Sequence, residues 1–201
     1  MADLYYTIEA PSEAQYTEKR SKFLAYAFPV SAAAEAKEYV AQMQKRYYDA
    51  RHVCWAYMLG SARNDFQSND NGEPSGTAGK PILGQINSLG LTNVLVVVVR
   101  YFGGIKLGTS GLIVAYRTAA RMALEAASVV ERHDMARVSF HFPYPAMNAA
   151  MKLTKDFDVA IVDRCFDNTC SMTLEINADA APLLRARIAD IDGATLADDN
   201  R

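Results

Sequence analysis

The sequence predicts an α+β fold in two domains, which we place at residues 1–130 and 131–201. Segments with strand composition alternate with segments of helical periodicity along the whole chain. The length of 201 residues exceeds a typical single domain of roughly 100 to 150 residues, yet leaves little room for more than two. Half of the residues are apolar and 22% are charged, so each domain can bury a core.

The first domain combines β-branched and aromatic runs with segments whose apolar residues recur three and four positions apart. Runs of the first kind predict strands at 22–30, 52–59 and 91–100, and segments of the second kind predict helices at 32–48, 81–89 and 112–127. Ser31 is expected to cap the first of these helices. Turn signals predict an exposed loop or hairpin tip at 60–79 and a glycine-rich loop at 101–111.

The second domain shows the order strand, helix, strand, strand, helix, which is typical of a small α/β sandwich. We expect strands at 136–142, 159–165 and 170–177, and helices at 146–157 and 180–188. The turn between the second and third strands is marked by Asp167 and Asn168.

The chain begins with neither a basic stretch nor an apolar one, and its strongest apolar run, 94–99, is far too short to span a bilayer. Its three cysteines cannot all pair within one chain. A cytoplasmic location is therefore expected. Cys165 and Cys170 either face each other across a hairpin or, as we favour, are small buried hydrophobic residues.

The net charge of −2 conceals a division between the two halves of the chain. Residues 1–130 carry 13 basic and 11 acidic groups, whereas residues 131–201 carry 8 and 12. The stretch 74–124 has no acidic residue at all. Such a stretch can produce a local positive potential on an acidic protein. Its basic residues are Lys80, Arg100, Lys106, Arg117 and Arg121, the last two four positions apart on one helix face.

The glycine-rich segment 100–111 joins a predicted buried strand to a predicted helix. Glycines allow close backbone approach, and the start of a helix offers unpaired N–H groups to a phosphate or another anion. Tyr101 and Phe102 can stack on bases if they point outward. The alternative is a tight structural turn whose aromatic residues fill the core. The segment matches neither the P-loop nor the dinucleotide-binding fingerprint.

The loop 70–81 contains two carboxylates, two hydroxyls and a lysine among glycines. It can bind phosphates through backbone N–H groups, or orient Glu73 beside a substrate. A rigid turn that leads into a helix is the other interpretation. Catalytic and metal-binding motifs are absent, since His52, His133 and His141 belong to no pattern with serine, cysteine or acidic residues. We therefore expect no catalytic residue, no metal and no cofactor.

Several long ordered motifs resemble the signature of the IMPACT family, including its YigZ-like bacterial members. They are 72–79 (GEPSGTAG), 81–83 (PIL) and 96–108 (VVVVRYFGGIKLG), together with 21–23 (SKF) and His52. The resemblance implies a first domain like the second domain of a small-subunit ribosomal protein. It also implies a ferredoxin-like second domain, similar to the last domain of elongation factor G. Family members in eukaryotes are linked to translational control and to regulatory protein partners.

The charge pattern and the resemblance together predict a non-catalytic protein that binds RNA or the ribosome, with a translation-regulatory protein as a further partner. An enzyme acting on a phosphorylated small molecule and a protein-docking regulator are the alternatives. The candidate anion- or RNA-binding residues are Lys22, His52, Glu73, Ser75, Thr77, Arg100, Tyr101, Phe102, Gly103, Gly104, Lys106, Gly108, Arg117 and Arg121.

Overall fold

A computed structural model describes residues 4–167 and 169–197 of the chain. The fold is α+β, and the chain divides into two compact units. The first unit spans Tyr5–Arg132, and the second contains the residues from His133 onward. Among the described residues, no helix combines the length and the apolar character needed to cross a membrane.

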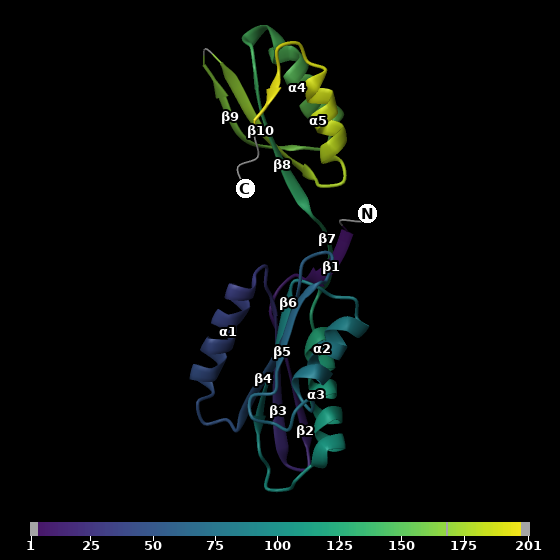
Figure 1. The fold of residues 1–201 in the computed structure, drawn as a ribbon. Coiled ribbons are helices and arrows are strands. Elements are labelled where there is room, and N and C mark those ends of the chain that lie inside the picture. Colours follow the sequence, from purple (N-terminus) through teal and green to yellow (C-terminus); the bar gives the residue numbers. More distant parts are fainter. Residues whose placement is uncertain (1–3, 168, 198–201) are drawn as a thin grey trace. The chain divides into compact units, whose positions relative to one another are not determined.

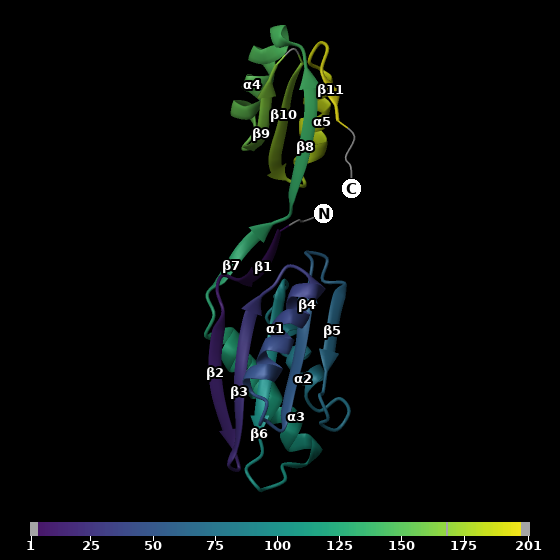
Figure 2. The same cartoon turned by 90° about the vertical axis from the view of Figure 1, so that its left-hand side faces the viewer.

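The first unit is built on a five-stranded sheet in the order β2-β3-β6-β4-β5 (Figure 2). All four pairings in it are antiparallel. The central strand β6 carries the continuous valine run, and all of its residues except the last are buried. The strands are β2 (Ser12–Glu18), β3 (Ser21–Pro29), β6 (Val94–Tyr101), β4 (His52–Leu59) and β5 (Asp65–Asn69).

Helices cover both faces of this sheet, α1 on one side and α2 with α3 on the other (Figure 1). They are α1 (Ala33–Arg46), α2 (Gly79–Ser88) and α3 (Gly108–Glu125). The apolar stripe predicted on the last helix is buried in the core, and Arg117 and Arg121 are exposed. Two separate cores result, because the alternation of strand residues sends even and odd positions to opposite faces.

Four predicted features of the first unit differ from the structure. Strand β5 interrupts the predicted loop 60–79, and α3 begins at Gly108, inside the predicted loop 101–111. Ser31 is not the cap of α1: its hydroxyl and its N–H both donate to the Glu35 carboxylate. Three strands were not predicted: β1 (Leu4–Ile8) and β7 (Val129–His133), which form a two-stranded sheet, and β2. The exposed residues of β2 are mostly polar and lack strand composition, whereas β1 has the aromatic and β-branched composition of a strand.

The second unit follows the order β-α-β-β-α-β, with its four strands arranged β11-β8-β10-β9. This is a ferredoxin-like arrangement. One face of the sheet packs on both helices around a core that includes Phe140, Phe142 and Met172. The elements are β8 (Met135–Phe142), the 3-10 helix η1 (Tyr144–Ala146), α4 (Met147–Asp156), β9 (Ala160–Phe166), β10 (Cys170–Asn177), α5 (Ala181–Ala189) and β11 (Thr195–Leu196).

The two cysteines of this unit do not face each other. In the β9–β10 hairpin Cys165 pairs in register with Ser171, and Cys170 pairs with Phe166. Cys170 is buried, as predicted, but Cys165 is exposed. Strand β9 lies at the edge of the sheet with every residue exposed, which is why a cysteine there remains accessible to solvent.

Gly103 makes the closest backbone approach in the first unit. A Cβ at this position would lie 2.1 Å from the carbonyl carbon of Arg20. We expect Gly103→Ala to lower the free energy of unfolding by about 1 to 3 kcal/mol, because the backbone must shift. Gly84→Ala is the matched control: it has open space in the interior of α2 and should be neutral or stabilising by up to about 1 kcal/mol. Urea unfolding of both variants tests this, and equal stabilities would contradict it.

Candidate anion-binding site

The strand register aligns three side chains across the end of the sheet. Arg100 on β6 lies opposite Phe23 on β3 and opposite His52 on β4. Register partners in a sheet point to the same face, here the face covered by α2 and α3. Lys22 and Tyr101 are also register partners, but they are one position away in each strand and so belong to the opposite face.

Tyr101 accordingly packs in the core on the α1 side rather than beside Arg100. Its hydroxyl donates a 2.8 Å hydrogen bond to Asp49 Oδ1. This hydrogen bond to a carboxylate raises the pKa of Tyr101 to about 12. Tyr101 and Lys22 are therefore separated by the sheet from the other candidate residues.

A buried ion pair forms the floor of the site. Arg100 Nη1 donates to Glu73 Oε1 over 2.6 Å, and both side chains are at least 93% buried. The Tyr116 hydroxyl donates to the same oxygen over 2.7 Å. We expected Arg100 to contact phosphate at an open surface. Instead it is buried, and its charge is neutralised by Glu73 of the same domain. The function of this arginine is first to hold Glu73 in place.

The imidazole of His52 lies next to this pair and is oriented by a hydrogen bond to the backbone. Its Nδ1 lies 2.8 Å from the carbonyl oxygen of Asn71, which can only accept a hydrogen bond. In the neutral ring Nδ1 therefore carries the proton, and Nε2 is left as an acceptor. Nε2 lies 3.7 Å from Glu73 Oε2.

Tyr116 and Cys54 extend the buried network but offer no activated nucleophile. The Cys54 Sγ lies 3.3 Å from the Tyr116 hydroxyl. Burial raises the pKa of Cys54 to about 12 and raises the pKa of Tyr116 well above its ordinary value. Both groups are protonated at neutral pH, so Tyr116 is a stable donor to Glu73.

The loop before α2 directs its amides inward. Asp70 accepts backbone hydrogen bonds from Gly76, Ala78 and Gly79 over 2.8 to 3.0 Å. The buried Thr77 hydroxyl donates to the Pro74 carbonyl. These amides are thus occupied by Asp70 and are not offered to a phosphate, contrary to one of the two interpretations. Ser75 is exposed on the outside of the loop.

In the second glycine-rich turn, fewer backbone groups are available to a ligand than its sequence indicates. Gly103 packs on the backbone of Arg20 and donates its N–H to the Ser21 hydroxyl over 3.2 Å. Gly104 and Gly108 both adopt the positive φ that favours glycine. Of these three glycines, Gly108, at the start of α3, lines the pocket described next.

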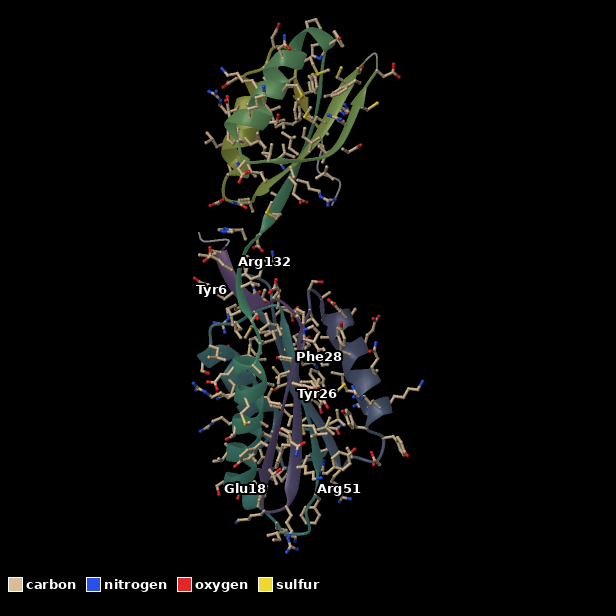
Figure 3. All side chains as sticks on the ribbon, turned by 180° about the vertical axis from the view of Figure 1, so that it is seen from behind. Tyr6, Glu18, Tyr26, Phe28, Arg51 and Arg132 are labelled. Atoms are coloured by element: carbon tan, nitrogen blue, oxygen red, sulfur yellow. The ribbon has the colours of Figure 1, made fainter. Side chains whose placement is uncertain are left out.

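A pocket of about 570 Å³ opens above the ion pair. It is bounded by the ends of β4 and β6, by Glu73 and Pro74, and by the start of α3 with its unpaired N–H groups. Its charged lining consists of Arg51, Arg100 and Lys106 against Glu73 alone. Figure 3 labels Arg51 at this end of the first unit, where β6 also runs into the loop 102–107.

A second hollow of about 550 Å³ lies between α2 and α3. Lys80, Arg117 and Arg121 line it, and Arg121 pairs with Glu125 over 2.7 Å. Within the described part of the chain, Lys80 and Arg117 form no ion pair. Pro74 lines the pocket and Gly76 lines this groove, so a single short loop separates the two.

Four residues of the buried network, the pocket and the groove were not among the predicted site residues. Tyr116 resembled an ordinary member of an apolar helix stripe, and its contact with Glu73 depends on how α3 packs. Asn71 and Arg51 carried no motif signal of their own. Lys80 had a usable signal, since it belongs to the acid-free stretch 74–124.

Fold and site together define a two-domain α+β protein with a basic pocket and groove on its first domain. The sequence profile of the Impact N-terminal domain matches residues 19–124, just over half of the chain. The chain therefore belongs to the IMPACT family. This confirms the resemblance found in its motifs.

Curated sequences and a solved structure are similar to this chain. IMPACT family member YvyE of Bacillus subtilis is 39% identical over 67% of this chain, and the match spans 62% of that protein's length. YigZ of Escherichia coli is 29% identical over 89% of this chain and 88% of its own. A crystal structure of a hypothetical protein, 27% identical, aligns over 100% of both chains with a TM-score of 0.74.

Removal of the buried carboxylate at the floor of the site should be costly. Glu73→Ala leaves Arg100 buried without its counter-charge, and we expect a loss of about 3 to 5 kcal/mol in the free energy of unfolding. Glu125→Ala, which breaks the exposed pair with Arg121, should cost no more than about 1 kcal/mol. Urea denaturation at pH 7 measures both, and similar losses would contradict the structural importance of Glu73.

Asp70 should make stability depend on pH in the acid range. Burial alone would raise the pKa of this carboxyl, but its three backbone hydrogen bonds and Lys80 lower the pKa below the ordinary value. The carboxylate therefore stabilises the fold above about pH 4, and this contribution disappears as the pH falls through the lower folded value.

The test compares Asp70→Ala with the exposed Asp65→Ala. At pH 7 we expect the first to lower the free energy of unfolding by about 1 to 2 kcal/mol, as the loss of a helix cap does. The second should change it by less than about 0.5 kcal/mol. The difference between Asp70→Ala and the unmodified protein should shrink below pH 4. A difference that stays constant down to pH 2 would show that folding does not lower the pKa of Asp70 and would contradict this prediction.

Proposed function

We propose that this chain is a non-catalytic, translation-associated protein that binds RNA through the basic groove and pocket of its first domain. One observation carries the proposal. The exposed cations Lys80, Arg117, Lys106 and Arg51 surround the loop 73–76, two of them on each side. Cations without ion pairs in two neighbouring hollows suit a polyanion, because each can neutralise a separate phosphate and release its counterions.

An exposed aromatic ring in the basic pocket supports a nucleic acid rather than an acidic protein as the ligand. The pocket adds Phe102, whose side chain is 49% exposed beside Lys106 and therefore available for stacking on a base. Stacking surfaces next to phosphate-binding cations are typical of sites for single-stranded nucleic acid. The association with translation rests on the resemblance to family members that act there.

A small phosphorylated substrate is the second candidate. It is favoured by the position of Glu73 beside Gly108, at the start of α3, within one pocket. Against turnover, Glu73 Oε1 is already bonded to Arg100 and Tyr116, and the Cys54 thiol is protonated at neutral pH. We therefore favour binding over catalysis.

The groove cations give a direct test by salt dependence. We expect the double variant Lys80→Ala, Arg117→Ala to bind single-stranded RNA more weakly, whatever its sequence. The slope of log K against log salt concentration should become shallower by about 0.7 for each phosphate that the variant no longer neutralises. Fluorescence anisotropy between about 50 and 200 mM salt measures both quantities.

Lys37→Ala with Lys45→Ala is the matched control. It removes the same charge from exposed positions of α1, on the opposite face of the sheet. This variant should retain the slope of the unmodified protein. If both double variants reduced the RNA affinity and the salt slope equally, binding would depend on overall charge and not on the groove. The absence of RNA binding at low salt would refute the proposal outright.

A further inference from the structure

When His52 is neutral, two hydrogen-bond acceptors line the pocket without a donor. Glu73 Oε1 receives two donors, from Arg100 and Tyr116, whereas Oε2 receives none from the described residues. The nearest polar atom recorded for Oε2 is His52 Nε2 at 3.7 Å. In the neutral ring this nitrogen is also an acceptor, because Nδ1 donates to Asn71. A group that donates two hydrogen bonds would satisfy both atoms.

The charges nearby restrict the chemistry of that donor. Arg51, Arg100 and Lys106 line the same pocket, so an ammonium group would meet three positive charges and one negative charge. Neutral hydroxyl groups avoid this repulsion. A vicinal diol can donate one hydrogen to Glu73 Oε2 and the other to His52 Nε2.

Other lining residues of the pocket suit an anion. Lys106 and the unpaired N–H groups at Gly108 and Thr109 lie at the start of α3. Arg100 adds a fixed positive charge beneath the pocket: its side chain is more than nine-tenths buried, and its buried Nε has no hydrogen-bond partner among the described residues. A phosphate is the anion that this arrangement of donors fits best.

Phe102 supplies the third element, an aromatic surface. One side of its ring faces Arg100, whose Cζ lies 5.6 Å from the ring centroid, and about half of the side chain is exposed. The pocket volume of about 570 Å³ is within the usual range for small-molecule sites. A planar base, a phosphate and a vicinal diol occur together in a ribonucleotide.

We infer that this pocket binds a ribonucleotide whose 2′ and 3′ hydroxyls are both free. Such a group is either the 3′-terminal residue of an RNA strand or a free mononucleotide. The RNA source rests on the proposed function, with the strand continuing along the groove of Lys80 and Arg117. Internal residues of RNA are excluded from the pocket because their 3′ oxygen is esterified, and DNA is disfavoured because it lacks the 2′ hydroxyl.

The first experiment changes only the ligand, so it does not depend on the folding of variants. A 5′-labelled single-stranded RNA is prepared with a terminal 2′,3′-diol, with a 2′,3′-dideoxy end and with a 3′-phosphate. Removal of both hydroxyls should weaken binding about tenfold, because they donate hydrogen bonds to a charged acceptor. The 3′-phosphate should also weaken binding, although its added charge would strengthen a purely electrostatic complex.

A second arm distinguishes the two sources of the ligand. Adenosine 5′-monophosphate should bind directly, as isothermal titration calorimetry measures, and its 2′,3′-dideoxy analogue should bind about tenfold more weakly. Phe102→Ala should weaken binding of the diol-ended RNA about tenfold, because it removes the stacking surface. Phe66→Ala, on the exposed edge strand β5, is the matched control and should leave binding unchanged.

The outcomes separate this inference from the proposed function. Equal binding of diol and dideoxy ends, together with RNA binding, would overturn the pocket assignment and leave RNA binding in place. Binding of the mononucleotide with preference for the diol, but of no RNA, would confirm the pocket and refute the proposed function. Binding of neither ligand would refute both.

Discussion

The buried ion pair between Glu73 and Arg100 is the constraint on which the site depends. A charged pair that is removed from water is stable only if its geometry and its further hydrogen bonds compensate the loss of hydration. Here the Tyr116 hydroxyl supplies one such bond, and Arg100 remains in place between the rings of Phe23 and Phe102. The pair connects the loop before α2 to the central strand and, through Tyr116, to α3.

This constraint divides the basic residues into two groups. Arg100 is committed to the interior, where its charge fixes the position of a carboxylate. Lys80, Lys106 and Arg117 remain exposed, so they are available to a ligand in water. The backbone N–H groups of the loop 70–79 are likewise used within the protein. They donate to the Asp70 carboxylate, which thereby determines where α2 begins. The proposed anion-binding groups are therefore exposed side chains and the start of α3, rather than both glycine-rich turns.

Much of the fold was predictable because local signals agreed with the final structure. The valine run of β6, the aromatic β3 and β4, and the periodic α1 and α3 all have compositions that match their burial. Strands β2 and β5 were missed because edge strands are half exposed and here carry polar residues. Their pairing comes from the neighbouring strand rather than from their own sequence. Strand β11 has only two residues, too few for any pattern.

The sequence by itself determined the two-domain α+β class, the family, and the concentration of positive charge in one acid-free stretch, since composition and motif order are properties of the chain alone. Only the tertiary structure decided which charges are free. Arg100 and Arg117 are equivalent in a list of basic residues, yet strand register places one opposite His52 and above Glu73 while helix periodicity exposes the other. The physical reason is that pairing and burial depend on which distant residue lies within a few ångströms, and the alternation of side chains along a strand sends adjacent residues such as Arg100 and Tyr101 to opposite faces.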